Sequence, residues 1–435
     1  MKQIFFNKIK TKLTKNEFYA NIATLISGSI ISQAIPILIS PILSRIYTPD
    51  DFSLLALYLS ITNIFSVIAS GRYDLAIMVA DRNEEAINIL ALSLVISVFT
   101  TLVLIPISLI FNDFISRILK NDELSKWLIV AVLGILLTTA NQNLFYWNNR
   151  NKNFKVVAIN RVVQSGTSGF FQIIFGYLIK TVSGGFIIIG QFLGSLVAVL
   201  KLIINFIKYD RINIKYVSLS KIKEMAKKYS EFPKKTILSS LLNIFSNNGR
   251  YLILSFFLDK ASLGSLFFSL RILLLPVSVI GNNIADVTYQ KVVELRKKGV
   301  NRNYIKKMIN KIVFHLSLVI IIPIIVLAIF GKQIFSFLFG SNYILAGTYS
   351  SILSFSLLFQ FIFSPFCKVF YAYEKNNIYL LWEILRVIIF FIPIFILGIA
   401  KAPSIYIIIS ISISIIINYT ILFIFLQGIL NEKDN

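Results

Sequence analysis

The 435-residue sequence has one cysteine, Cys367, and one histidine, His315. One residue of each type provides neither a disulfide framework nor a zinc site built on thiolates or paired imidazoles. Charged residues are also scarce, at 14% of the chain, whereas a soluble domain has roughly a quarter. These shortages argue against metalloenzymes, redox enzymes and ordinary soluble domains. We therefore expect no metal site, no cofactor and no catalytic residues of those classes.

Hydrophobic residues are abundant, at 56% of the chain, and the mean hydropathy is +0.77. A bilayer core about 30 Å thick is crossed by about 20 apolar residues in a helix. The sequence contains twelve runs of this kind and therefore predicts an all-α integral membrane protein. The expected spans are 19–42, 52–70, 86–111, 127–147, 159–178, 185–207, 236–258, 264–285, 312–339, 345–370, 378–397 and 403–426.

The formal net charge of +23 follows the expected topology. With the N-terminus inside, alternate connecting segments and the two tails hold 30 basic residues, and the opposite side holds 8, when Lys368 and Lys332 near span ends are counted with the adjoining segments. The positive-inside rule then places both termini in the cytoplasm. The charge is explained by topology, so no nucleic-acid partner is expected.

Two long connecting segments, 208–235 and 286–311, are basic and are expected to be cytoplasmic loops. The first contains KIKEMAKKYSEF, which has apolar and basic positions at helical spacing. This pattern is typical of an amphipathic helix that lies on anionic lipid. Recruitment of a partner enzyme is the alternative interpretation.

Polar residues recur about 210 positions apart, which indicates an internal duplication. The first span carries Ser29, Gln33, Pro36 and Ser40, and the seventh carries Ser239, Asn243, Ser246 and Arg250. Ser66, Ser70 and Asp74 near the second span match Ser278, Asn282 and Asp286 near the eighth. We predict two six-helix lobes around a central cleft, residues 1–207 and 236–435, joined by a basic linker at 208–235.

Basic residues inside the expected spans need separate explanations. Arg161 and Lys201 lie near span ends and are expected to reach lipid headgroups. Arg250 and Arg271 lie eight residues inside their spans, at a depth of about 12 Å. Guanidinium groups match phosphate oxygens, so these two predict an anion site. The expected hydrogen-bonding neighbours are Gln33, Asn243, Ser246, Asn247 and Asn282.

Glu383 is the only acid well inside an expected span, and Arg386 follows three residues later. This spacing favours an ion pair within one helix. A role in coupling transport to protons or cations is the functional alternative for Glu383, and Asp74 is a second candidate for that role.

Two stretches carry a family resemblance: R-x-Y-T-P-x-D-F at Arg45–Phe52 and G-R-Y-D-L-A-I at Gly71–Ile77. They resemble the amino-terminal signature of the polysaccharide-biosynthesis flippases. These are Wzx-type translocases of O-antigen or capsule repeat units, in the multidrug/oligosaccharidyl-lipid/polysaccharide exporter superfamily. The resemblance implies a MATE-like two-lobed fold and a cavity lined mainly by spans 1, 2, 7 and 8.

The same resemblance implies a transporter of the bacterial inner membrane. Its substrate would be an undecaprenyl-diphosphate-linked oligosaccharide that moves to the outer leaflet by alternating access. Membrane lipids and other polysaccharide-assembly proteins are the further partners that the resemblance suggests.

Two alternatives remain open. A cation-coupled multidrug exporter could share the fold, although arginines in the cleft would repel cationic drugs. A membrane sugar polymerase or ligase would act on the same lipid carrier. Such an enzyme is expected to have a long outer loop, whereas the longest one here, 112–126, has about fifteen residues. No G-x-x-x-x-G-K-[ST] loop is present to bind ATP.

Overall fold

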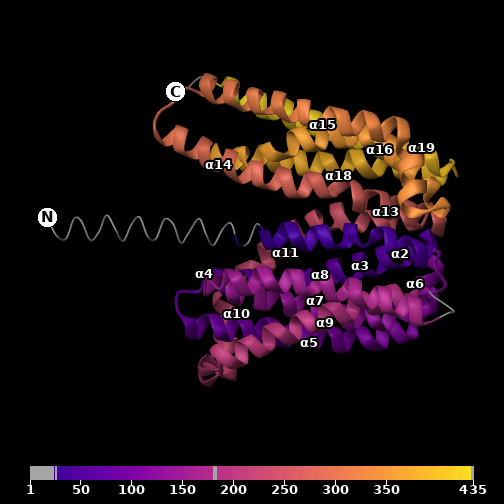
Figure 1. Cartoon of the computed structure of the whole chain (residues 1–435). Coiled ribbons are helices and arrows are strands. Elements are labelled where there is room, and N and C mark those ends of the chain that lie inside the picture. Colours follow the sequence, from indigo (N-terminus) through magenta and orange to yellow (C-terminus); the bar gives the residue numbers. More distant parts are fainter. Residues whose placement is uncertain (1–23, 25–26, 180–183, 433–435) are drawn as a thin grey trace. The chain divides into compact units, whose positions relative to one another are not determined.

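The computed structural model describes residues 24, 27–179 and 184–432, and this part of the chain consists of helices joined by short turns, with no strand. It divides into two compact units. Unit 1 comprises 1–46 and Leu54–Arg250, and unit 2 comprises Tyr47–Ser53 and Tyr251–Asn435. Within each unit the long helices run side by side (Figure 1).

Unit 1 begins, in its described part, with a helix that ends as α2 (Ser40–Ile46), and α3 (Pro49–Ala69) follows after the short segment that belongs to unit 2. The rest of unit 1 consists of long helices and of shorter helical segments between them. These helices are α4 (Tyr73–Val79), α5 (Asn83–Ile110), α6 (Asn112–Ile118), α7 (Leu124–Arg150), α8 (Phe154–Leu178), α9 (Gly185–Tyr209), η1 (Arg211–Tyr216), α10 (Leu219–Lys228), α11 (Glu231–Ile244) and η2 (Phe245–Gly249).

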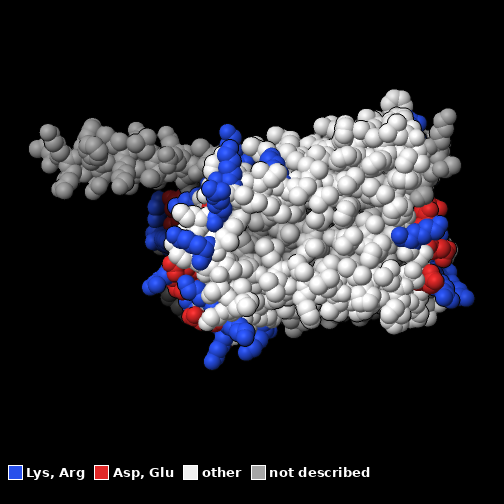
Figure 2. All heavy atoms as spheres, turned by 90° about the horizontal axis from the view of Figure 1, so that it is seen from below, with Lys and Arg blue, Asp and Glu red and all other residues white. Residues whose placement is uncertain are grey.

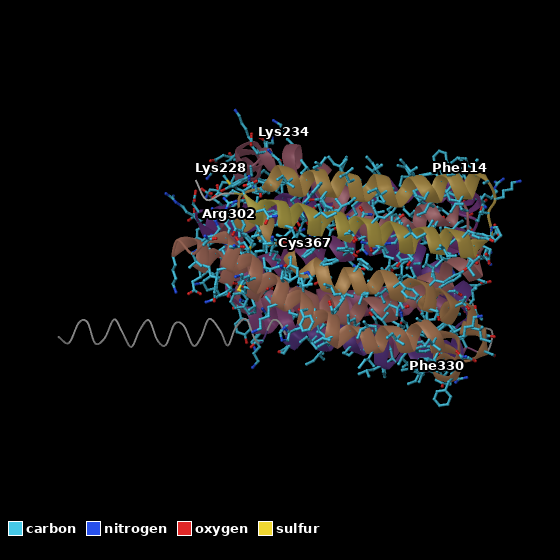
Figure 3. The ribbon with its side chains drawn as sticks, turned by 90° about the horizontal axis from the view of Figure 1, so that it is seen from above. Phe114, Lys228, Lys234, Arg302, Phe330 and Cys367 are labelled. Carbon is cyan, nitrogen blue, oxygen red and sulfur yellow. The ribbon has the colours of Figure 1, made fainter. Side chains whose placement is uncertain are left out.

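Unit 2 contains most of α12 (Arg250–Ser255), which continues from η2, and the helices that follow it. These are α13 (Lys260–Pro276), η3 (Val277–Gly281), α14 (Asn282–Lys297), α15 (Arg302–Phe339), η4 (Ser341–Tyr343), α16 (Ile344–Phe363), η5 (Ser364–Phe366), α17 (Val369–Ala372), α18 (Asn376–Ile399) and α19 (Ser404–Asn431). In Figure 3, Arg302 and Phe330 lie at opposite ends of unit 2, and Lys228 and Phe114 lie at opposite ends of unit 1.

Ten helices in the described residues are long and apolar enough to cross a membrane. Ten of the twelve expected spans fall on them. The other two, 159–178 and 236–258, are helical as α8 and as the continuous run of α11, η2 and α12, but they do not combine the length and hydropathy of a span. Both runs carry polar side chains and an arginine, and it is these residues that lower the hydropathy.

The surfaces of the long helices are suited to lipid. On the middle of α15 exposed apolar side chains recur at helical spacing, and they include Phe314, Leu318, Ile322, Ile325 and Ile329. Figure 2 shows charged residues gathered toward the two ends of one face, with an uncharged band between them. Such a band is expected where acyl chains replace water, because a charged side chain in that region is costly.

The segment 286–311 is not the loop that the sequence suggests. α13, η3 and α14 form one helical run from Lys260 to Lys297, and α15 begins at Arg302. Each of these two helical runs has 38 residues, which corresponds to a length of about 57 Å. Both therefore extend beyond a 30 Å bilayer core. The expectation of an extended loop is wrong because Val292, Leu295, Ile305 and Ile309 are buried in the core of unit 2 and stabilise the hairpin.

The linker helix α10 packs against unit 1. Met225 is buried in a core cluster with residues of α4 and α5, such as Ile77 and Ala86. Lys228 Nζ lies 2.8 Å from a carboxylate oxygen of Glu85, and Lys221 Nζ lies 3.3 Å from Glu84. The apolar side of α10 is therefore occupied by protein, and the expectation that this side inserts into lipid is wrong for Met225.

Candidate functional site

The first stretch of the resemblance, Arg45–Phe52, runs from the end of α2 into α3, and its residues from Tyr47 onward belong to unit 2. Thr48 and Asp51 form a reciprocal cap: the Thr48 amide donates to Asp51 Oδ2 at 2.7 Å, and the Asp51 amide donates to Thr48 Oγ1 at 3.4 Å. Pro49 occupies the first helical position, which suits its fixed φ. The Tyr343 hydroxyl donates to the Tyr47 carbonyl at 2.7 Å. These bonds fix the start of α3 and therefore the position of Phe52, which follows Asp51 in the sequence.

Arg271 on α13 lies over the ring of Phe52, with Cζ 5.9 Å from the ring centroid. Phe52 is fully buried, and its ring contacts those of Phe268, at 4.9 Å, and Tyr343, at 6.1 Å. The Arg271 side chain is half-buried. Within the described part of the chain its guanidinium has no hydrogen bond and no ion pair. Arg271 is therefore a half-buried cation beside an aromatic cluster, and its N–H groups are available to a ligand.

Arg250 follows a π-helical segment, η2 (Phe245–Gly249). Its Nε donates to the carbonyl of Asn247 at 2.7 Å, so the guanidinium is held back along its own helix. Two residues of α3 form hydrogen bonds with this π-helical segment. Ser60 Oγ donates to the Asn248 carbonyl at 2.7 Å, and Asn63 Nδ2 donates to Asn248 Oδ1 at 3.3 Å. π-Bulges occur frequently at functional sites because they redirect side chains and free carbonyls.

The eighth expected span contains a second π-helical segment, η3 (Val277–Gly281), directly after Pro276. Ser278 Oγ donates to the Leu275 carbonyl there at 3.0 Å. The sequence signals were visible as Asn247-Asn248-Gly249 in one helix and as Pro276 in the other. Neither signal by itself distinguishes a π-bulge from an ordinary kink.

The structure describes the side chains of three of the five predicted hydrogen-bonding neighbours. Asn243 and Asn247 are exposed, and Asn247 Nδ2 donates to the Asn243 carbonyl at 3.0 Å. Gln33 is half-buried, and its Nε2 donates to the Ser29 carbonyl at 3.2 Å. The side chains of Ser246 and Asn282 lie outside the described residues. Arg250 belongs to unit 1 and Arg271 to unit 2, so their meeting at one anion stays a prediction.

Glu383 and Arg386 form the ion pair that their spacing predicts, with Glu383 Oε2 2.7 Å from Arg386 Nη2. The Tyr379 hydroxyl donates to Glu383 Oε1 at 3.0 Å, and the Arg386 guanidinium lies 5.2 Å from the Trp382 ring. Both charged side chains are 19% exposed. The pair is therefore neutralised within α18.

A double-mutant cycle on this pair separates a structural role from coupling. Arg386→Leu is expected to lower the amount of folded protein in membranes, because breaking a buried pair costs about 3–5 kcal/mol. Adding Glu383→Gln should restore the amount toward that of the wild type. Abundance is measured by quantitative immunoblotting, and activity is measured on the same variants. A double variant that is abundant but inactive would contradict the structural role and would indicate coupling through Glu383.

Asp74 lies in the second stretch of the resemblance, Gly71–Ile77. Gly71 and Arg72 have positive φ, 56° and 57°, and form the turn between α3 and α4. The Asp74 side chain is fully buried, with Oδ2 3.6 Å from Arg72 Nη1. Burial raises the pKa of Asp74 above its usual range, and Arg72 opposes this shift. The Tyr73 hydroxyl donates to the Ala226 carbonyl at 3.0 Å, so this stretch also holds the linker helix.

Unit 1 contains a polar cavity of about 330 Å³ between α7, α8 and α9. Its lining comprises Thr138, Asn141, Gln142, Phe145, Tyr146, Val157, Asn160, Arg161, Gln164 and Leu202. The Arg161 guanidinium lies 5.0 Å from the Phe145 ring, and Nη1 donates to Ser29 Oγ. The expectation that Arg161 reaches headgroups is therefore wrong, because the side chain folds against this cavity.

Sequence reasoning missed the cavity. The available signal was a set of amide side chains inside two apolar runs, namely Asn141 and Gln142 in one and Asn160 and Gln164 in the next. These residues belong to different helices, and the sequence does not show which of their faces meet. In the described residues no group of three or more His, Cys, Asp or Glu side chains could hold a metal ion.

Comparison with known proteins gives a family and a fold. The model of the family described as "Polysaccharide biosynthesis protein" matches residues 42–347. No curated protein sequence matches the chain significantly.

Three solved structures resemble the chain over most of its length. One is titled "Lipid II flippase MurJ, inward closed conformation"; it is 15% identical, with 93% of this chain and 87% of that chain covered and a TM-score of 0.71. A second, a multidrug resistance MATE family transporter of the MOP superfamily in an inward-facing conformation, is also 15% identical (92% and 94% covered, TM-score 0.71). A third is a MOP superfamily transporter from Pyrococcus furiosus, titled for the reverse polarity of its binding pocket (15% identity, 95% and 96% covered, TM-score 0.63).

At this level of identity the likeness establishes the fold alone, and it is MATE-like, as the sequence predicted. With ten apolar helices in the described residues, the chain is a multi-pass membrane protein. The solved structures that share this fold are titled as a flippase and as transporters.

Proposed function

Because the chain belongs to the polysaccharide biosynthesis protein family, we propose that it is a Wzx-type flippase. Its substrate is an undecaprenyl-diphosphate-linked oligosaccharide repeat unit, of the kind used for O-antigen, capsule or lipopolysaccharide. The protein moves this lipid from the cytoplasmic to the outer leaflet of the bacterial inner membrane by alternating access. Other polysaccharide-assembly proteins supply the lipid and use it.

The observation that supports this function best is the state of Arg271. A charged side chain within a membrane span is costly unless it is paired or faces a polar cavity. Arg271 has a ring contact with Phe52 and no hydrogen bond or ion pair within the described part of the chain. A diphosphate supplies the missing partner, because a guanidinium binds phosphate oxygens through two parallel hydrogen bonds.

We assign the remaining predicted residues to the same substrate. Arg250 follows the π-bulge of its helix and provides a second guanidinium for the diphosphate. Amide and hydroxyl groups satisfy the hydroxyl groups of the sugars as they leave water. They are supplied by Gln33, Asn243, Ser246, Asn247 and Asn282. The two lobes that alternate around them are residues 1–207 and 236–435, with 208–235 as the linker.

A cation-coupled multidrug exporter is less well supported by the acids in the chain. Glu383 lies 2.7 Å from Arg386, and Asp74 lies 3.6 Å from Arg72. Each candidate coupling acid therefore has a cationic neighbour that competes with a proton or a metal cation. Export of a diphosphate needs no such coupling, because a membrane potential that is negative inside favours outward movement of negative charge by about 2.3 kcal/mol per charge per 100 mV.

The proposed function is tested by deleting the gene. The expected result is loss of surface polysaccharide together with accumulation of a lipid-linked oligosaccharide in the cytoplasmic leaflet. Thin-layer chromatography and mass spectrometry of extracted lipids identify the accumulated species. Unchanged lipid-linked oligosaccharide with normal surface polysaccharide would contradict the proposal.

The proposed orientation, with both termini and the 208–235 segment in the cytoplasm, has its own test. Ser220, near the start of α10, is changed to cysteine in a Cys367→Ser background. An impermeant maleimide is expected to label this variant only after the cells are opened, because 30 basic residues resist translocation. The exposed residue Asp122 between α6 and α7, changed in the same way, serves as the control for the outer side. Labelling of the Ser220 position in intact cells would contradict the orientation.

A further inference from the structure

We propose that the cavity between α7, α8 and α9 of unit 1 binds one sugar residue of the transported lipid-linked oligosaccharide. This inference rests on the proposed function and adds a second binding site to it, separate from the arginines assigned to the diphosphate. The cavity volume of about 330 Å³ falls at the lower end of the range for small-molecule sites. It is sufficient for a single sugar ring and too small for a whole oligosaccharide.

The amide side chains in the lining are oriented by a chain of hydrogen bonds. Asn160 Nδ2 donates to Asn141 Oδ1 at 3.0 Å, and Asn141 Nδ2 donates to Gln164 Oε1 at 3.1 Å. Gln164 Nε2 donates to Ser195 Oγ at 3.2 Å, and Ser195 Oγ donates to the Gln191 carbonyl at 3.1 Å. Each amide nitrogen uses one of its two protons in this chain. The second proton of each remains for a ligand.

One buried acceptor in the lining is left without a donor. Asn160 is 4% exposed, and its Oδ1 has no hydrogen-bond partner in the described residues. An unsatisfied buried polar atom costs about 1–3 kcal/mol, and native structures rarely retain one without a reason. A sugar hydroxyl donates one hydrogen bond and accepts two, so one hydroxyl can bond to Asn160 Oδ1 and to a neighbouring amide proton.

Arg161 and the aromatic rings of the lining add the other groups that a sugar-binding site uses, namely N–H donors and flat apolar surfaces. Arg161 uses Nη1 for Ser29 and lies over the Phe145 ring, which leaves further N–H groups for oxygen atoms of a ligand. Phe145 and Tyr146 provide flat apolar surfaces for the C–H faces of a sugar ring. No Asp or Glu lines the cavity, so the site repels organic cations and favours hydroxyl-rich or acidic sugars.

The cavity lies well inside the helices that form it. Arg161 is seven residues from the start of α8 at Phe154, and Asn141 is nine residues from the end of α7 at Arg150. These spacings correspond to about 10 and 14 Å. In the proposed orientation both helix ends are cytoplasmic. A sugar that enters this cavity has therefore left the cytoplasm while its lipid still belongs to the inner leaflet.

The test compares two ligands on the purified full-length protein in nanodiscs. One is the radiolabelled lipid-linked oligosaccharide extracted from cells that lack the gene, and the other is undecaprenyl diphosphate without sugar. Arg161→Ala and Gln142→Ala are expected to weaken binding of the oligosaccharide lipid by about tenfold. Both should leave binding of undecaprenyl diphosphate unchanged. Lys155→Ala, which removes an exposed basic residue of α8 outside the cavity lining, is the matched control and should bind both ligands like the wild type.

The outcomes separate this inference from the proposed function. Equal weakening of binding for both ligands would show that the cavity binds the diphosphate. Unchanged binding of both ligands would show that the hydrogen-bonded amide side chains are structural. Either result overturns the sugar site and leaves the proposed flippase function standing. Failure of the wild type to bind either ligand would overturn the proposed function and this inference with it. Gel filtration of each variant establishes that the protein is folded before binding is measured.

Discussion

Arg271→Ala is expected to abolish surface polysaccharide while leaving the amount of protein in the membrane close to that of the wild type. The guanidinium has no hydrogen bond or ion pair in the described residues, so its removal costs unit 2 only the contact with the Phe52 ring. Its loss removes the proposed partner of the substrate diphosphate. Arg271→Lys should restore transport only in part, because lysine keeps the charge but loses the two-pronged geometry.

The control for this experiment is Lys332→Ala, which removes an exposed basic residue from α15. It is expected to leave both abundance and surface polysaccharide unchanged. A structural role for Arg271 predicts a different pattern, in which Arg271→Ala is degraded and the phenotype follows abundance. Normal transport by a well-expressed Arg250→Ala, Arg271→Ala double variant would rule out the assignment of both arginines, although not the family.

A second large effect is expected at the contact between α8 and α9. A Cβ atom on Gly194 would lie 2.6 Å from the amide nitrogen and 2.7 Å from the Cα of Ser168. Small residues allow helix backbones to approach this closely in membranes. Gly194→Leu is therefore expected to separate the two helices at a cost of about 1–3 kcal/mol or more.

Gly166→Leu is the matched control, because a Cβ at Gly166 on α8 meets no atom within 4 Å. The measurement is the midpoint of thermal unfolding in detergent, followed by the fluorescence-detected elution profile of a tagged protein. Gly194→Leu should unfold at a lower temperature or aggregate, and Gly166→Leu should resemble the wild type. Equal stability of the two variants would contradict the close packing of α8 on α9.

The fold was predictable where one physical effect dominates. The hydrophobicity of runs such as 86–111 and 403–426 places α5 and α19, because an apolar segment of this length is stable only as a helix in lipid. The ion pair of Glu383 and Arg386 follows from helical spacing alone. Both predictions depend on residues that are close in the sequence.

The predictions were poorer where distant segments meet. Arg161 was expected at the headgroups because its depth in α8 allows it to reach them, but its contacts are Ser29 and Phe145. The amphipathic pattern of α10 fits a lipid surface as well as a protein surface, and only the packing of Met225 in unit 1 decides between them. The contact of Arg271 with Phe52 joins residues 219 positions apart in the sequence, and hydropathy carries no information about it.

The central claim is movement of a lipid-linked oligosaccharide between leaflets, and the most direct measurement is its leaflet distribution in proteoliposomes. The lipid extracted from cells that lack the gene is reconstituted with the purified protein, and an impermeant reagent that oxidises sugars reports the fraction in the outer leaflet. In vesicles loaded with reductant, the wild-type protein should make all of the lipid reactive, whereas protein-free vesicles and Arg271→Ala vesicles should protect about half. Protection of the same half by well-folded wild-type protein would contradict the account.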